Sequence, residues 1–312
     1  MEVLECTAIV VGYIDYLDHD KIVKLISAEH GLISAMAKGA RRAKSRKFTH
    51  SLDIGNIVQV QIIPSKSHGS MWKLQQASLK KACHIARRDL HKTALIAYAC
   101  EIVYSLSAVE TPEPKLYGLL ETLIQQLNQR KGNEGFGDCY RIAFELKALS
   151  FAGLMPTLRR CVACTYPLST DIKFNVVEGG IFHSNCLPVS SNINKRNITA
   201  SHSSIFSFEN KTNSHSTQQS QKSSSPNTTK RTSTIYNVSE IWRQSALQVL
   251  YTPLEESIGA TFPNGPKWVF SQMLEFHRQR RLKSKIFLKN IQEPNIRTTD
   301  ISENPLKLQS HS

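Results

Sequence analysis

The residues of this chain whose types and spacing best suit chemistry form two pairs of potential metal ligands. Cys161 and Cys164 make the first pair, His183 and Cys186 make the second, and two residues separate the partners of each pair. Gly179-Gly180 lies just before the second pair, where a hairpin between the two knuckles can turn. This layout is typical of a zinc ribbon, in which thiolates and imidazoles complete a tetrahedral site. We therefore predict one structural Zn²⁺ per chain on these four side chains; the alternative is a set of chance cysteines in a core.

No pattern in the chain indicates catalysis. Four protein ligands close the tetrahedral shell of zinc and leave no position for water or substrate, whereas a metalloenzyme needs an open position. The sequence contains no Gly-x-Ser-x-Gly, P-loop or His-Glu-x-x-His motif. Asp15, Asp18 and Asp20 resemble a carboxylate metal site, but a solvated loop is the better interpretation. We expect a protein that is not an enzyme and has no catalytic residue. Apolar surroundings predict core positions for Cys6, Cys83, Cys100 and Cys139.

The densest positive charge lies between Lys38 and Lys47, where six of ten residues are cations and none is an acid. A charge run is usually only a solvated face. This run, however, follows two segments that alternate like β-strands, and a cationic loop on a small barrel can hold a nucleic-acid backbone. Trp72 is either a core residue or a stacking platform for a base. The nucleic-acid contacts predicted here are Lys38, Gly39, Arg41, Arg42, Lys44, Ser45, Arg46, Lys47, Trp72 and Lys73.

The overall charge also favours a polyanionic partner. The net charge is +14 and the pI is near 9.5, which suits nucleic acid or an anionic membrane surface. A second group of six cations between Arg278 and Lys289 contains no acid and exceeds what a helix dipole needs. Two separate patches fit a long polyanion better than a small ligand. From the second patch we predict contacts by Arg280, Arg281, Lys283 and Lys285.

The first 80 residues have the apolar alternation of short strands. Five strands in this length suit an OB-like barrel, and an SH3-like barrel is the alternative because strand counting does not determine topology. Residues 15–20 are expected to be an acidic connection. The expected strands span residues 3–11, 21–27, 32–37, 57–63 and 72–79.

After residue 80 the apolar period becomes helical, so the predicted fold class is α+β. Residues 90–106 are apolar nearly all round, and residues 116–127 carry one apolar stripe. Pro266 is expected to begin a last helix. The expected domains are an OB-like barrel (1–80), a helical domain in two parts (81–160 and 235–290), a zinc-ribbon-like insert (161–187), a disordered Ser/Asn-rich linker (188–234) and a flexible tail (291–312).

Three segments, in this order along the chain, resemble the bacterial RecO family of recombination mediators. The first is the stretch 29–45, which is similar to the family's hairpin and the basic motif after it. The second begins with the helix 141–147, continues through Pro156 and reaches the Cys161–Cys164 pair. The third is the stretch 280–288. The chain departs from the family at His183, because members that hold the metal often have cysteine there.

The resemblance implies a cytoplasmic, nucleoid-associated protein of DNA repair and homologous recombination that makes and breaks no bond. It would bind single- and double-stranded DNA, anneal complementary strands and assist loading of RecA together with RecR. It would also contact the C-terminal tail of single-strand binding protein, and it would have no membrane partner. An acidic N-terminus and the lack of an apolar span of ~18 residues agree with this location. The alternative function is a zinc-ribbon and OB protein that binds RNA in ribosome or tRNA biology.

Overall fold

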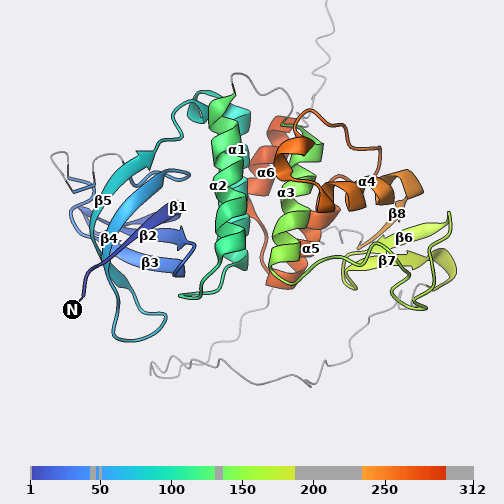
Figure 1. Cartoon of the computed structure of the whole chain (residues 1–312), viewed down its shortest axis with the longest axis horizontal. Helices are drawn as coiled ribbons and strands as arrows, with labels where there is room; N and C mark the ends of the chain where they lie inside the picture. Colours follow the sequence, from blue (N-terminus) through green and yellow to red (C-terminus); the bar gives the residue numbers. More distant parts are fainter. Residues whose placement is uncertain (1, 43–46, 49–50, 131–135, 187–233, 293–312) are drawn as a thin grey trace, which may run out of the picture.

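The computed structural model describes residues 2–42, 47–48, 51–130, 136–186 and 234–292. A β-barrel lies at one end of the molecule, a bundle of helices occupies the middle and a small sheet lies at the other end (Figure 1). In the described part of the chain, no helix is long and apolar enough to cross a membrane. The predicted residues Lys44, Ser45 and Arg46, the linker up to residue 233 and the tail from residue 293 lie outside the described residues.

The N-terminal strands form a closed barrel in the order β1-β2-β3-β5-β4, which confirms the predicted five-stranded OB-like fold. All pairs are antiparallel except β3 with β5. The side chains facing the interior form one apolar cluster that includes Val23, Leu25, Val58 and Val60. The strands are β1 (Leu4–Tyr16), β2 (Asp20–Ser27), β3 (Gly31–Ala37), β4 (Ile57–Ile63) and β5 (Trp72–Lys81).

The hairpin between β1 and β2 differs from the prediction of a loop over residues 15–20. β1 continues to Tyr16 after a register shift between Val10 and Gly12, so Asp15 lies on a strand and pairs with Lys21. The acids at positions 15, 18 and 20 suggested a loop, and Tyr13, Ile14 and Tyr16 are all exposed here, so no alternation of buried and exposed side chains marks this part of the strand. Only the turn between Tyr16 and Asp20 separates the two strands.

The helices beside the barrel follow the predicted pattern. α1 (Leu90–Leu106) is buried on most sides, and α2 (Pro114–Gln129) buries its predicted apolar stripe against the shared core. Asp89 caps α1 by accepting the N–H of Lys92, and Pro114 stands at the start of α2, where its missing N–H costs nothing. α3 is Asp138–Phe151. Short 3₁₀ helices span Ala86–Arg88, Ser184–Cys186 and Leu254–Ser257.

The C-terminal part corrects two predictions. Residues 235–238 are not helical: β8 (Ile235–Val238) pairs with β6 (Ile172–Asn175), and the sheet order is β7-β6-β8. Pro266 precedes a helix, but that helix is not the last, because α6 packs on α1 beyond it. The remaining elements are β7 (Gly180–His183), α4 (Glu240–Tyr251), α5 (Val269–Arg278) and α6 (Lys283–Gln292).

A direct backbone contact joins the barrel to the helices. Gly31 begins β3 with a φ of 61°, and a Cβ at this position would lie 1.8 Å from the carbonyl oxygen of Thr111. Next to it, the N–H of Leu32 donates to the Ala108 carbonyl and the N–H of Glu110 donates to the Leu32 carbonyl. The barrel and the segment between α1 and α2 therefore form a tight backbone seam.

This seam predicts that Gly31→Ala destabilises the protein far more than Gly69→Ala. Gly69 also has a positive φ, of 75°, but its Cβ would meet nothing within 4 Å. We expect about 1 kcal/mol of lost unfolding free energy at Gly69 from backbone strain alone. Overpacking at Gly31 should add about 1–3 kcal/mol more. Urea unfolding of both variants measures this difference, and equal losses would contradict the tight seam.

Candidate metal centre and nucleic-acid interface

The four predicted metal ligands gather at one point of the zinc-ribbon-like insert. The ligand atoms of Cys161, Cys164, His183 and Cys186 all lie within 4.8 Å of one another. The first pair lies on a knuckle closed by the N–H of Thr165, which donates to the carbonyl of Cys161. The second pair lies at the end of β7 and in the short helix after it. The structure therefore assembles a Cys₃His cluster from two separate segments.

A close backbone approach holds the first knuckle against β7. The N–H of Val162 donates to the Ile181 carbonyl at 2.9 Å, and the N–H of Ile181 donates to Thr157. Gly180 allows this approach, because a Cβ there would lie 2.5 Å from Cγ2 of Val162. From the sequence, Gly179-Gly180 was interpreted only as a turn. In the structure, Gly180 is needed because a side chain there would collide with Val162.

The tautomer of His183 suits metal binding. Its Nε2 lies 2.9 Å from the Pro167 carbonyl, which can only accept a hydrogen bond, so Nε2 carries the proton. Nδ1 then points its lone pair at the cluster, 3.4 Å from Sγ of Cys164 and 3.7 Å from Sγ of Cys186. Metal-bound histidines commonly donate their other N–H to a backbone carbonyl in this way. The residues present therefore fit a tetrahedral ion with three thiolates and one imidazole.

The thiol pKa values also suit a cation at this position. Burial raises the pKa of Cys161, but backbone N–H groups of Cys164, His183 and Ala163 outweigh it together and lower that pKa to about 6. Partial burial, with hydrogen bonds and like charge from Cys164 and Cys161, raises the pKa of Cys186 to about 11. Several thiolates at one point repel one another, and a divalent cation removes that cost. The other four cysteines are buried, as predicted.

The start of the basic run is tied to the β1–β2 hairpin. Gly39 has a φ of 72°, and its N–H donates to the Asp20 carboxylate at 2.7 Å. The N–H of Arg41 donates to the His19 carbonyl, and its guanidinium donates to Leu17 and lies 3.7 Å from Asp15. The acidic residues that looked like an independent loop therefore orient the basic run. Arg42 is exposed, with no ion pair in the described residues.

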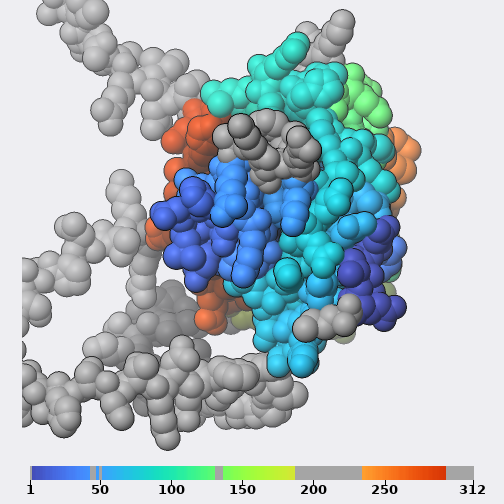
Figure 2. All heavy atoms as spheres, turned by 90° about the vertical axis from the view of Figure 1, so that its left-hand side faces the viewer, coloured from blue at the N-terminus to red at the C-terminus, as the bar shows by residue number. Residues whose placement is uncertain are grey.

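Three predicted cations line one groove on the barrel. Lys38, Lys47 and Lys73 come from the end of β3, the basic run and the start of β5, and all three are exposed. The groove has a volume of about 330 Å³, and no carboxylate is among its described lining residues. Figure 2 shows this end of the molecule, where the blue atoms of the first strands lie beside the cyan atoms around β5. The rest of the lining is Phe48, Gln61, Leu74, Gln75 and Gln76.

Trp72 does not belong to this exposed surface. Its side chain is only 7% exposed, and its indole N–H donates to the Glu110 carboxylate at 2.7 Å. The ring also lies beside that of His30, with 6.1 Å between centroids. A base cannot stack on a ring that is enclosed in this way, so the structure corrects the stacking role and supports the core role.

The C-terminal cations lie at the junction of α5 and α6. Arg280 and Arg281 are exposed between the two helices, with no ion pair in the described part of the chain. Lys283 and Lys285 begin α6, where the helix dipole disfavours positive charge, so the dipole does not explain them. Lys285 pairs with Glu275 at 2.8 Å and is therefore committed within the protein. The exposed members of this patch are Arg280, Arg281 and Lys283.

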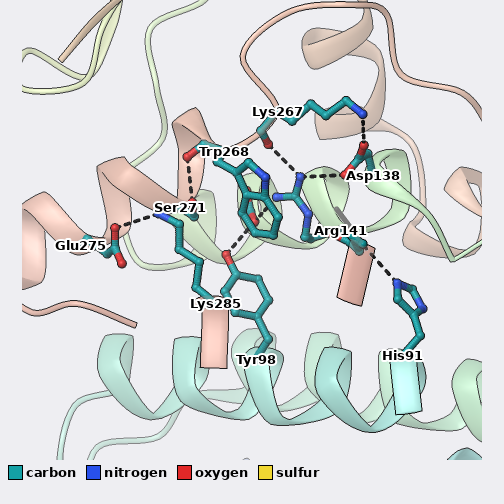
Figure 3. Close-up of polar contacts among 11 residues, drawn as sticks. His91, Tyr98, Asp138, Arg141, Lys267, Trp268, Ser271, Glu275 and Lys285 are labelled. Carbon is teal, nitrogen blue, oxygen red and sulfur yellow. Dashed lines mark hydrogen bonds and ion pairs between the residues drawn. The ribbon is translucent and has the colours of Figure 1, made fainter. Parts of the chain in front are cut away.

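A buried polar network holds the helices that carry this patch (Figure 3). Arg141 of α3 is fully buried; its guanidinium donates to Glu145 at 2.5 Å, to Asp138 at 3.1 Å and to the Lys267 carbonyl at 2.8 Å. It also lies 3.7 Å from the ring centroid of Trp268, just before α5. Sequence reasoning placed Arg141 in a family motif but gave it no role, since charged helix residues usually face solvent.

A second link seats α6 on α1. The Glu101 carboxylate accepts the N–H of Lys283 at 3.0 Å and that of Ser284 at 2.8 Å, and it caps α6 from another helix. No sequence pattern predicts this cap, because more than 180 residues separate the partners.

The fold and the cluster together define a class: an OB-like barrel joined to a helical domain that carries a Cys₃His insert. The family model described as recombination protein O N terminal matches residues 1–83, and the model described as recombination protein O C terminal matches residues 87–210. The chain belongs to the RecO family of DNA repair proteins.

Curated relatives agree with this family. A protein named DNA repair protein RecO from Myxococcus xanthus is 32% identical over 186 residues, which cover 60% of this chain and 73% of that protein. Proteins with the same name from Desulfatibacillum aliphaticivorans and Halalkalibacterium halodurans are 30% and 29% identical. They align over 58% and 57% of this chain and over 70% and 67% of their own lengths.

Proposed function

We propose that this protein is a non-enzymatic mediator that binds single- and double-stranded DNA, anneals complementary strands and assists RecA loading with RecR. The groove that gathers Lys38, Lys47 and Lys73 carries this proposal, because these three exposed ammonium groups face no carboxylate among the described lining residues. Membership of a DNA repair family favours DNA over the alternative RNA partner. RecR, RecA and the C-terminal tail of single-strand binding protein are its proposed protein partners.

The chemistry of the groove suits backbone recognition without a sequence code. Lysine and arginine neutralise phosphates and release counterions, which gives affinity for any sequence. Neutralising two strands on one surface also lowers the repulsion between them, which favours annealing. The Cys₃His cluster is proposed to hold one Zn²⁺ that shapes the insert, since four protein ligands leave no open position.

Replacing Lys38, Arg42, Lys47 and Lys73 with alanine together is expected to weaken DNA binding strongly. Loss of four phosphate contacts should reduce the slope of log affinity against log salt by about 3 for single-stranded DNA. Fluorescence anisotropy with a labelled oligonucleotide at several salt concentrations measures this slope. The same variant should anneal complementary strands slowly, with and without single-strand binding protein.

The matched control is Lys115→Ala, which removes an exposed lysine at the start of α2, outside the groove. It should leave the affinity and the salt slope almost unchanged. If the fourfold variant kept the wild-type slope of log affinity against log salt, the proposed role of the groove would be wrong. Stronger binding of RNA than of DNA of the same length and sequence would favour the alternative function.

A further inference from the structure

β5 connects the basic groove to a second hollow on the same barrel. Lys73 at the start of β5 lines the groove, and Lys81 at its end lines a hollow of about 260 Å³ between the barrel and α2. The cyan atoms around β5 run across the barrel surface in Figure 2. Lys73 and Lys81 are eight residues apart along β5, so they are about 26 Å apart in an extended strand. A strand of about eight stacked nucleotides spans that distance.

The lining of this hollow differs from that of the groove. Its lining includes Ile57 of β4 and Ile124 of α2, whose side chains are 1% and 3% exposed and therefore form a closed apolar base. Gln125 and Gln129 supply amides at its wall, and the exposed imidazole of His84 stands at its rim. The hollow is thus apolar at the base and has donors and acceptors around it.

The polar groups of the hollow fall into two sets. Asn128 is committed to the protein: its amide oxygen accepts the N–H groups of Ile85 and Ala86, and its amide nitrogen donates to Ala82. By contrast, four other side chains make no hydrogen bond or ion pair with any described residue: those of Lys81, His84, Gln125 and Gln129. Asn128 therefore holds the hollow in shape, and the other four side chains are available to a ligand.

The surroundings are cationic. Lys81 is exposed in the lining of the hollow, and Arg130, exposed at the end of α2, directly follows the lining residue Gln129. Of the acids near its lining residues in sequence, Asp53 pairs with Arg87 at 3.3 Å and Asp89 caps α1, while Glu121 lies one helical turn before Gln125 and is not among the lining residues. Lys81 and Arg130 outnumber Glu121 at the hollow, so a ligand there should carry negative charge beside an uncharged group.

We propose that this hollow receives one unpaired base of a single DNA strand whose backbone follows β5 from the basic groove. The base would stack against the exposed imidazole of His84 and hydrogen-bond to Gln125 or Gln129. Lys81 would hold the adjoining phosphate. Histidine is among the side chains on which bases stack, and such stacking tolerates any base. This inference rests on the proposed function and deepens it, because a base inside a duplex cannot enter the hollow.

The test uses the full chain and the double variant His84→Ala/Gln125→Ala, which removes base contacts and no lysine or arginine. Three probes are compared: a 20-nucleotide single strand, the same strand with abasic sites throughout, and a 20-base-pair duplex. We expect about tenfold weaker binding of the normal single strand and less than twofold change for the other two probes. Gln126→Ala, on the same helix but outside the hollow, should change none of them.

Each other outcome is decisive. Equal losses on the normal and abasic strands would mean that the hollow contacts only phosphate and would overturn the proposal. No loss on any probe would overturn it as well. Failure of the wild-type chain to bind any probe would refute the proposed function itself, so the two failures are distinguishable. Circular dichroism melting of the double variant at the wild-type temperature excludes misfolding as the cause.

Discussion

Arg141→Met is expected to lower the free energy of unfolding by about 3–5 kcal/mol, because it leaves the fully buried carboxylate of Glu145 without its counter-charge. Tyr98 also donates to that carboxylate, at 2.6 Å, but one neutral hydroxyl does not replace a guanidinium. The change also removes the bonds that hold the start of α5 to α3. Urea unfolding followed by circular dichroism gives the magnitude.

The control is Arg41→Met, which breaks a pair with Asp15 in which both side chains are about half exposed. Exposed pairs contribute about 0.2–1 kcal/mol, so this variant should unfold almost like the wild type. The double variant Arg141→Met/Glu145→Leu should recover part of the loss, since it removes both buried charges. A loss below about 1 kcal/mol in Arg141→Met would show that the network does not hold the helices together.

Removal of the metal is expected to unfold the Cys₃His insert while the barrel stays folded. Structural zinc binding contributes about 10–16 kcal/mol in zinc-finger peptides, far more than a three-stranded sheet of this size can replace. The small sheet also supports Phe174, which packs against Trp242 of α4 and Phe270 of α5. Loss of the sheet should therefore loosen α4 as well.

Hydrogen exchange before and after treatment with a chelator measures this effect. Amides of β6 and β7 should lose protection, and amides of β1 and β4 serve as the internal control. Elemental analysis should give about one zinc per chain, and Cys161→Ser should reduce it sharply. A purified chain that is metal-free and fully protected in β6 would refute the structural zinc.

The elements that sequence predicted best are those whose pattern comes from burial on one face. Leu116, Leu120 and Leu127 lie on one face of α2, so the helix can bury them only by turning that face to the core, and all three are fully buried. The grouping of the Cys₃His side chains could also be predicted from the sequence, because a tetrahedral zinc site restricts both the type and the spacing of its ligands. The five barrel strands followed from their alternation, whereas the closed order and the extension of β1 to Tyr16 needed the structure.

The features that sequence missed depend on distant partners. β8 has only four residues, and although Ile, Tyr and Val favour strands, only its pairing with β6 places it in a sheet. The sequence around Arg141 suggests an exposed charge. The side chain is buried because Lys267 and Trp268, more than 120 residues later in the chain, pack against it. His84 had no spaced partner in the sequence, and its hollow exists only where β5 meets α2.

The sheet order β7-β6-β8 has a consequence for chain topology. Both β7 and β8 hydrogen-bond to β6, so His183 at the end of β7 and Ile235 at the start of β8 are held roughly 14 Å apart by one sheet. The entropy of closing such a connection grows only logarithmically, by about 0.6 kcal/mol for each doubling of its length. The fold is therefore nearly indifferent to how many residues this connection contains, and the chain offers a natural insertion point for a reporter domain.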